Sequence, residues 1–102
     1  MRKKILFVAM AALTVAAAAA DDPSADFKKA DGELNHTYRE VEKRLSDDAD
    51  GKARLVSAQR TWIAFRDAEC TFQSSGDDGG SVAPLVVAGC KAKLTAERTE
   101  QL

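Results

Sequence analysis

Histidine and cysteine are scarce in this chain, and their scarcity excludes most kinds of metal centre. The 102 residues hold one His, His36, and two Cys, Cys70 and Cys90. A lone His on a polar stretch of helix is usually solvated. Two cysteines are better explained as a bridge than as metal ligands. The sequence therefore predicts no metal site and no cofactor.

Catalytic motifs are also missing. The serines lack the G-x-S-x-G context of an activated nucleophile. Glu69, Asp77 and Asp78 could supply a carboxylate pair, but the two aspartates lie in a Gly-rich loop, whereas catalysis requires groups that a scaffold holds firmly. The same loop lacks the alternating ligand spacing of an EF-hand. We therefore predict no catalytic residues and expect a protein that is not an enzyme.

No apolar run is long enough to span a membrane securely, which takes roughly 20 residues. Instead, residues 2–4 are basic, residues 5–15 are apolar apart from Thr14, and residues 16–20 are all Ala. This layout predicts a signal peptide over residues 1–20 with Ala18-x-Ala20 at the cleavage site, the alternative being an uncleaved anchor. No Cys stands at the junction to carry a lipid. We expect a periplasmic or secreted protein without a stable membrane anchor after cleavage.

Net positive charge is absent from the mature part. Residues 21–102 contain twelve Lys and Arg against sixteen Asp and Glu, a formal charge of −4. An acidic surface argues against nucleic acid and anionic lipid as partners. It permits a basic protein partner without requiring one.

What the mature part does contain is helical periodicity, with no strand signal, internal repeat or second domain. The first helix lies within Ser24 to Leu45, with Ser24 as the expected N-cap. Gly32 weakens its middle, so the helix could instead begin at Asp31. A polar connection is expected over residues 46–51. One apolar line recurs at a spacing of three and four, namely Phe27, Ala30, Leu34, Tyr38, Val41 and Leu45.

The second helix is expected from Lys52 to Gln73, and its inner face is unusually wide. Because a helix that is apolar over so wide an arc has two neighbours, we predict that it is the central helix. Its inner face is formed by Leu55, Gln59, Trp62, Ile63, Arg66, Cys70 and Gln73, widened by Ala58, Phe65 and Phe72 on one side and Val56 on the other.

A third helix is expected to begin near Pro84, which fits a first turn, and to run to the C-terminus. Its inner line is Val87, Cys90, Leu94, Arg98 and Gln101. The preceding loop, Ser74 to Ser81, is small, acidic and Gly-rich. It is either a solvated linker or a recognition loop; in the second case the partner-binding residues are Ser75, Gly76, Asp77, Asp78, Gly79, Gly80 and Ser81.

Export would place Cys70 and Cys90 in an oxidising compartment, where we expect them to pair within the chain. Two free thiols or an intermolecular bridge are the alternatives. The predicted fold is all-α, a small three-helix antiparallel bundle stapled by one disulfide. Antiparallel packing from that bridge sets Arg66 opposite Leu94, and then buried Trp62 opposite Arg98. Gln59 should then lie near Gln101 and Leu102.

Arg66 faces inward in this arrangement and has two interpretations. It could be a hook for an anion or ligand. It could also be a structural residue, paired with a carboxylate and tying the helices together. We prefer the structural role, because a small core needs its inward Arg satisfied.

The run from Ala58 to Cys70, AQRTWIAFRDAEC, resembles the signature of the LprI-like lysozyme inhibitor domain family. The resemblance continues in Asp31-x-x-Leu34-Asn35-x-x-Tyr38, and it resumes in residues 79–81, in Cys90 and in Leu94-Thr95-x-x-Arg98-Thr99-x-x-Leu102. It covers nearly the whole mature chain. The resemblance implies a small exported helical domain that binds and inhibits lysozyme.

Many relatives carry a further Cys pair near the first helix, and here that region has none. We therefore expect packing alone to hold the first helix. Two functions follow for the whole domain. One is inhibition of a basic lysozyme-type protein in the periplasm, with residues 74–81 entering its cleft; the other is a non-inhibitory envelope binding or scaffolding module.

Overall fold

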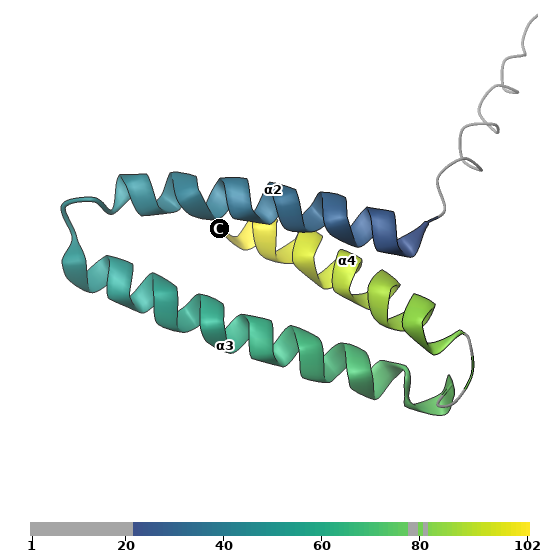
Figure 1. Cartoon of the computed structure of the whole chain (residues 1–102). Coiled ribbons are helices and arrows are strands. Elements are labelled where there is room, and N and C mark those ends of the chain that lie inside the picture. Colours follow the sequence, from purple (N-terminus) through teal and green to yellow (C-terminus); the bar gives the residue numbers. More distant parts are fainter. Residues whose placement is uncertain (1–21, 78–79, 81) are drawn as a thin grey trace, which may run out of the picture.

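A computed structural model describes residues 22–77, 80 and 82–102, and every regular element in them is helical. α2 spans Pro23–Arg44, α3 spans Ala49–Gln73, and α4 spans Ala83–Gln101 (Figure 1). A short 3₁₀ helix, η2, spans Ser75–Asp77 between α3 and α4. The prediction of an all-α fold with three helices is confirmed. The expected signal peptide lies outside the described residues.

The start of α2 differs from the prediction. Asp22, not Ser24, is the N-cap, and its carboxylate accepts from the backbone N–H groups of Ser24 at 3.0 Å and Ala25 at 3.3 Å. Pro23 fits the first turn because its missing N–H would have had no partner inside the helix. The helix is continuous through Gly32, where a side chain would meet nothing within 4 Å. The later start at Asp31 is therefore wrong.

The connection from α2 to α3 is shorter than expected. α3 begins at Ala49, because the carboxylate of Asp48 caps it by accepting from the backbone N–H of Gly51 at 2.8 Å. A side chain at Gly51 would collide with that carboxylate. Asp50 and Gly51, which the sequence suggested were part of the loop, lie in the first turn of α3.

The central helix is α4, which packs against both α2 and α3 (Figure 1). The prediction that the second helix is central is therefore wrong. α3 turns back from α2 through a tight turn, and α4 turns back from α3 to lie between them. The wide apolar arc of α3 is covered only in part: Phe65 is 55% exposed and Phe72 is 70% exposed.

The core is small and partly polar. Its buried apolar residues are Ala30, Leu34 and Cys70, while Gln59, Arg66, Ser74 and Thr95 are buried polar residues. The predicted inner line of α2 is confirmed, since the remaining members of that line are half-buried. Gly89 of α4 lies beside Pro23 of α2. A Cβ at position 89 would lie 3.9 Å from the Cβ of Pro23, an ordinary van der Waals distance. No helix in the described part of the chain is long and apolar enough to cross a membrane.

Candidate functional site

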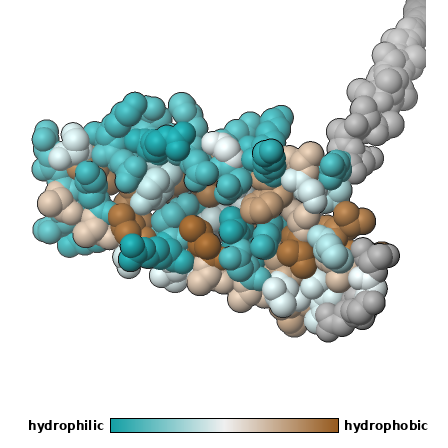
Figure 2. Space-filling view, in the orientation of Figure 1, coloured by the Kyte–Doolittle hydropathy of each residue, from teal (hydrophilic) through white to brown (hydrophobic). Residues whose placement is uncertain are grey.

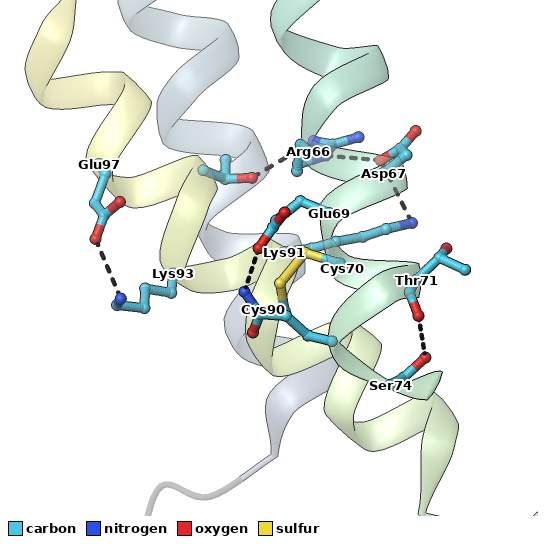
Figure 3. Close-up of a disulfide and its surroundings, with 12 residues drawn as sticks. Arg66, Asp67, Glu69, Cys70, Thr71, Ser74, Cys90, Lys91, Lys93 and Glu97 are labelled. Atoms are coloured by element: carbon cyan, nitrogen blue, oxygen red, sulfur yellow. Dashed lines mark hydrogen bonds and ion pairs between the residues drawn. A yellow bond between two sulfur atoms is a disulfide. The ribbon is translucent and has the colours of Figure 1, made fainter. Parts of the chain in front are cut away.

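A disulfide joins Cys70 in the last turns of α3 to Cys90 in α4, with their Cα atoms 5.5 Å apart (Figure 3). The predicted internal bridge is confirmed, and the alternatives of free thiols or an intermolecular bond are wrong. Cys70 precedes the end of α3 by one turn. The bridge therefore fixes the place where the chain leaves α3 for the loop over residues 74–81.

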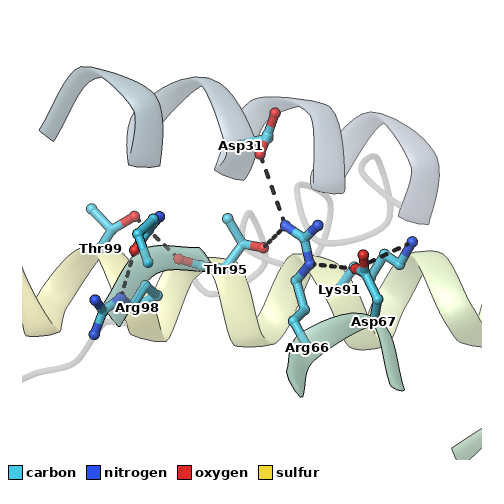
Figure 4. A network of polar contacts seen from close by, with 8 residues as sticks. Asp31, Arg66, Asp67, Lys91, Thr95, Arg98 and Thr99 are labelled. Atoms are coloured by element: carbon cyan, nitrogen blue, oxygen red, sulfur yellow. Dashed lines mark hydrogen bonds and ion pairs between the residues drawn. The ribbon is translucent and has the colours of Figure 1, made fainter. Parts of the chain in front are cut away.

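Arg66 lies one turn before Cys70, and its side chain contacts all three helices (Figure 4). Its Nε donates to Oδ1 of Asp67 at 2.9 Å, and its Nη1 donates to Oγ1 of Thr95 at 3.5 Å. Nη1 also lies 4.0 Å from Oδ1 of Asp31 in α2. Only 10% of the side chain is exposed. These contacts favour the structural role over a hook for a ligand, because acceptors of the bundle already face the guanidinium.

Two aromatic rings flank the same guanidinium. The Cζ of Arg66 lies 5.2 Å from the ring centroid of Phe27 and 5.3 Å from that of Trp62. Both distances are within the range of cation–π attraction. Arg66 therefore links a ring of α2 to a ring of α3 at a point where the apolar core is thin.

The carboxylate of Asp67 pairs with two cations, Arg66 and Lys91. The Nζ of Lys91 lies 3.6 Å from Oδ1 of Asp67, the oxygen that also accepts from Arg66. Burial by itself would raise the pKa of Asp67. The hydrogen bond from Arg66 and the positive charges of Arg66 and Lys91 outweigh it and hold the pKa of Asp67 below its usual value. Asp67 therefore stays ionised at neutral and mildly acidic pH.

The register expected from the disulfide also holds at Trp62, which lies one turn before Arg66 in α3. The Cζ of Arg98 lies 5.9 Å from the ring centroid of Trp62, as predicted. Nε of Arg98 donates to Oε1 of Gln59 at 3.0 Å, and Nη1 donates to Oε1 of Gln101 at 3.3 Å. Trp62 itself is half-buried, whereas we predicted it largely buried. The reason is that α4 covers only one side of α3.

The sequence reasoning missed Thr95, which is fully buried and receives the hydrogen bond from Arg66. Thr is mostly exposed in proteins, so its residue type gave no signal. The predicted inner line of α4 passes through Leu94 and not through Thr95, so the helical spacing did not indicate its burial either.

The expected recognition loop is described only in part. Ser74 is buried, with its Oγ donating to the carbonyl of Thr71 at 2.9 Å, and residues 75–77 form η2. Asp78, Gly79 and Ser81 lie outside the described residues. The partner-binding role of residues 75–81 therefore stays a prediction.

Other sites are not assembled in the described residues. His36 is exposed, and no group of three or more His, Cys, Asp or Glu side chains there could hold a metal ion. One shallow hollow of about 420 Å³ is lined by Phe27, Ala83, Pro84, Val87, Ala88 and Lys91. Another of about 330 Å³ is lined by Asn35, Tyr38, Val56, Gln59, Arg60 and Ile63. Neither brings together groups that would carry out a reaction.

Comparison with known proteins gives one family and one relative. A family model described as lysozyme inhibitor LprI matches residues 9–102. An uncharacterised protein of Rhizobium meliloti (strain 1021) is 41% identical over 88 residues, which cover 76% of this chain and 63% of that protein. The chain thus spans under two thirds of the relative's length. No solved structure matches the chain.

Proposed function

Because the chain belongs to the LprI lysozyme inhibitor family, we propose that it is an exported protein that binds a lysozyme and inhibits it. The family match over residues 9–102 is the observation that carries this proposal. The disulfide supports export, since such bonds persist in oxidising compartments outside the cytoplasm. The periplasm is the compartment that we propose, on the strength of the signal-peptide pattern in residues 1–20.

The proposed binding element is the segment from Ser75 to Ser81 with the adjoining end of α3. Asp77 and Asp78 give it two adjacent negative charges, and the mature part carries −4 in total. A basic lysozyme would be attracted to such a surface, and the attraction would raise the association rate most at low salt. The Cys70–Cys90 bridge supports this role, because it fixes the end of α3 from which the segment begins.

Inhibition can be measured as the rate at which a lysozyme clears a bacterial cell-wall suspension, with and without the purified protein. Asp77→Asn together with Asp78→Asn should weaken inhibition several-fold and should weaken it less at high salt. The helical circular dichroism signal and the melting temperature should stay nearly unchanged, because the two residues lie outside the three long helices.

The matched control removes the same charge at the other end of α3. Asp47→Asn together with Asp50→Asn changes two exposed acids of the α2–α3 turn and the first turn of α3. Equal loss of inhibition in both double variants would show that inhibition depends on net charge and not on the segment at residues 75–81. If wild-type protein inhibits no class of lysozyme at micromolar concentration, the non-inhibitory envelope module is the better description.

A further inference from the structure

One outward side of α3 carries little charge over about four turns. From Ser57 to Phe72, Arg60 is the one exposed charged residue, and it lies at the border of this side. The exposed residues on the rest of this side are uncharged. These residues, which we name the α3 outer face, are Ser57, Ala58, Thr61, Ala64, Phe65, Ala68, Thr71 and Phe72. Since 30% of the whole chain is charged, an exposed helix surface of this length should carry several charges.

Five members of the α3 outer face follow the spacing of a helix-pairing seam. Ala58, Thr61, Phe65, Ala68 and Phe72 are separated by three, four, three and four residues, which is the a/d pattern of a coiled coil. At 100° per residue this seam points well away from the buried side chains of Gln59, Arg66 and Cys70. Neither α2 nor α4 lies beyond it, because α3 forms one edge of the molecule (Figure 1).

We propose that the α3 outer face is a dimer interface, on which α3 of a second copy packs in the antiparallel direction. From Thr61 to Phe72 the seam alternates small and large side chains. In the antiparallel register with its two-fold axis between Arg66 and Asp67, Phe65 lies on Ala68 of the partner subunit. Phe72 then lies on Thr61 of the partner subunit, and two-fold symmetry repeats both pairs. Each large ring thus meets a small residue, as close packing requires.

Charge also favours a second copy over a basic protein at this surface. Two mature chains of formal charge −4 repel each other, and a contact between uncharged surfaces keeps their carboxylates apart. A basic partner would gain nothing from the α3 outer face, because no carboxylate lies on it. Homodimer interfaces are accordingly richer in apolar area than other protein surfaces.

The expected interface is small, which sets the expected affinity. One pair of four-turn helices buries on the order of 1,000 Å² in total, at the low end for specific complexes. Phe65 and Phe72, now 55% and 70% exposed, would supply the main anchors. We expect a dimer that dissociates on dilution through the micromolar range.

Sedimentation velocity over a dilution series tests the proposal on the protein purified from the periplasm. Wild type should shift from dimer to monomer on dilution, and Phe65→Glu should be a monomer throughout. Leu85→Glu is the matched control: Leu85 is 51% exposed on α4, so its change adds the same charge off the seam and should leave the dimer intact. A wild-type chain that is monomeric at every concentration overturns the proposal.

The pairing of large with small side chains allows a second test, which distinguishes this specific dimer from nonspecific apolar association. Ala68→Phe adds apolar surface but puts two rings where one fits, so it should weaken the dimer at least several-fold. Adding Phe65→Ala to Ala68→Phe exchanges the two sizes across the two-fold axis and should restore much of the affinity. Thermal melting of each variant shows that the fold is kept. Tighter association of the Ala68→Phe variant than of wild type would overturn the proposed register.

Discussion

The two helices that flank α4 are held to it in different ways. α2 makes the more extensive contact with α4, and it contributes Ala30 and Leu34 to the buried apolar core. α3 contributes only Cys70 as a buried apolar residue, and it is fastened through the disulfide and through polar contacts of Arg66 and Gln59. A small domain thus uses burial on one side, and on the other side a covalent staple where burial is insufficient.

The exposed surfaces of α2 and α3 also differ in charge. The exposed residues of α2 include eight charged ones, and side chains along it are mostly hydrophilic in Figure 2, whereas the lower edge that α3 forms is paler. The charged surface of α2 is suited to water. α3 also exposes charged residues, namely Asp50, Lys52, Arg54 and Arg60. Its outer face as defined above carries none and is suited to the further contact proposed there.

Leu34→Ala should have the largest effect on folding, because Leu34 is 2% exposed at the contact between α2 and α4. Loss of its side chain should lower the free energy of unfolding by about 3–5 kcal/mol. Urea denaturation followed by circular dichroism measures the change. His36→Ala, on the exposed side of the same helix, should change it by about 0.5 kcal/mol or less. Similar values for both variants would show that burial does not hold α2.

Changing Cys70 and Cys90 together to Ser should lower the free energy of unfolding by about 3 kcal/mol, as the chain-entropy model gives for a loop of this size. The loss should be local as well as global. Hydrogen exchange should increase more in the second half of α3 than in α2, because α2 keeps its apolar contact with α4. A uniform increase along both helices would contradict the contrast between them.

Trp62→Ala should cost about 2 kcal/mol, less than the 3–5 kcal/mol typical of fully buried aromatic residues, because the ring is only half-buried. The rings that flank Arg66 would be reduced to one, and Arg98 would lose its ring altogether. Thermal denaturation measures the cost, with Leu85→Ala on exposed surface as the control. A loss as large as that of Leu34→Ala would mean that α3 also depends on apolar burial.

Asp67→Asn should have the smallest effect, about 1 kcal/mol at neutral pH, because the carboxylate is half-exposed and water screens the pair. The pKa of Asp67 is lowered in the folded state. Its contribution is therefore present above the pKa of the unfolded chain, near 4, and is lost as pH falls through the lower folded value. Unfolding measured from pH 7 to pH 2 should show wild type and variant converging in acid. A constant difference over that range would exclude Asp67 as the cause.

The helices and the bridge could be predicted from the sequence because both depend on local or unambiguous signals. The spacing of Phe27, Leu34 and Tyr38 specifies a helix with one buried line. Cys70 and Cys90 have only each other to pair with in the chain, and their pairing sets the register that brings Arg98 to Trp62. The first cap was assigned wrongly because Asp22 and Ser24 are both good caps.

The candidate partner surface was harder to predict, because exposure depends on neighbours. Phe65 and Phe72 extend the apolar arc of α3, so their residue types suggested that they were covered. Nothing in the local pattern distinguishes a covered Phe from an exposed one. Thr95 presents the opposite case, since a polar residue is buried there only because Arg66 reaches it from another helix.

The sequence by itself determined three helices, the inner line of the first, the disulfide and the family, because helical periodicity, the pairing of two cysteines and the motif around Trp62 can all be read from the chain alone. Only the tertiary structure decided which helix lies in the middle and which residues of α3 face solvent. The physical reason is that a helix carries its own hydrogen bonds, whereas the burial of a side chain is decided by which other helix lies against it. Here that helix is α4, and it leaves the outer side of α3 uncovered.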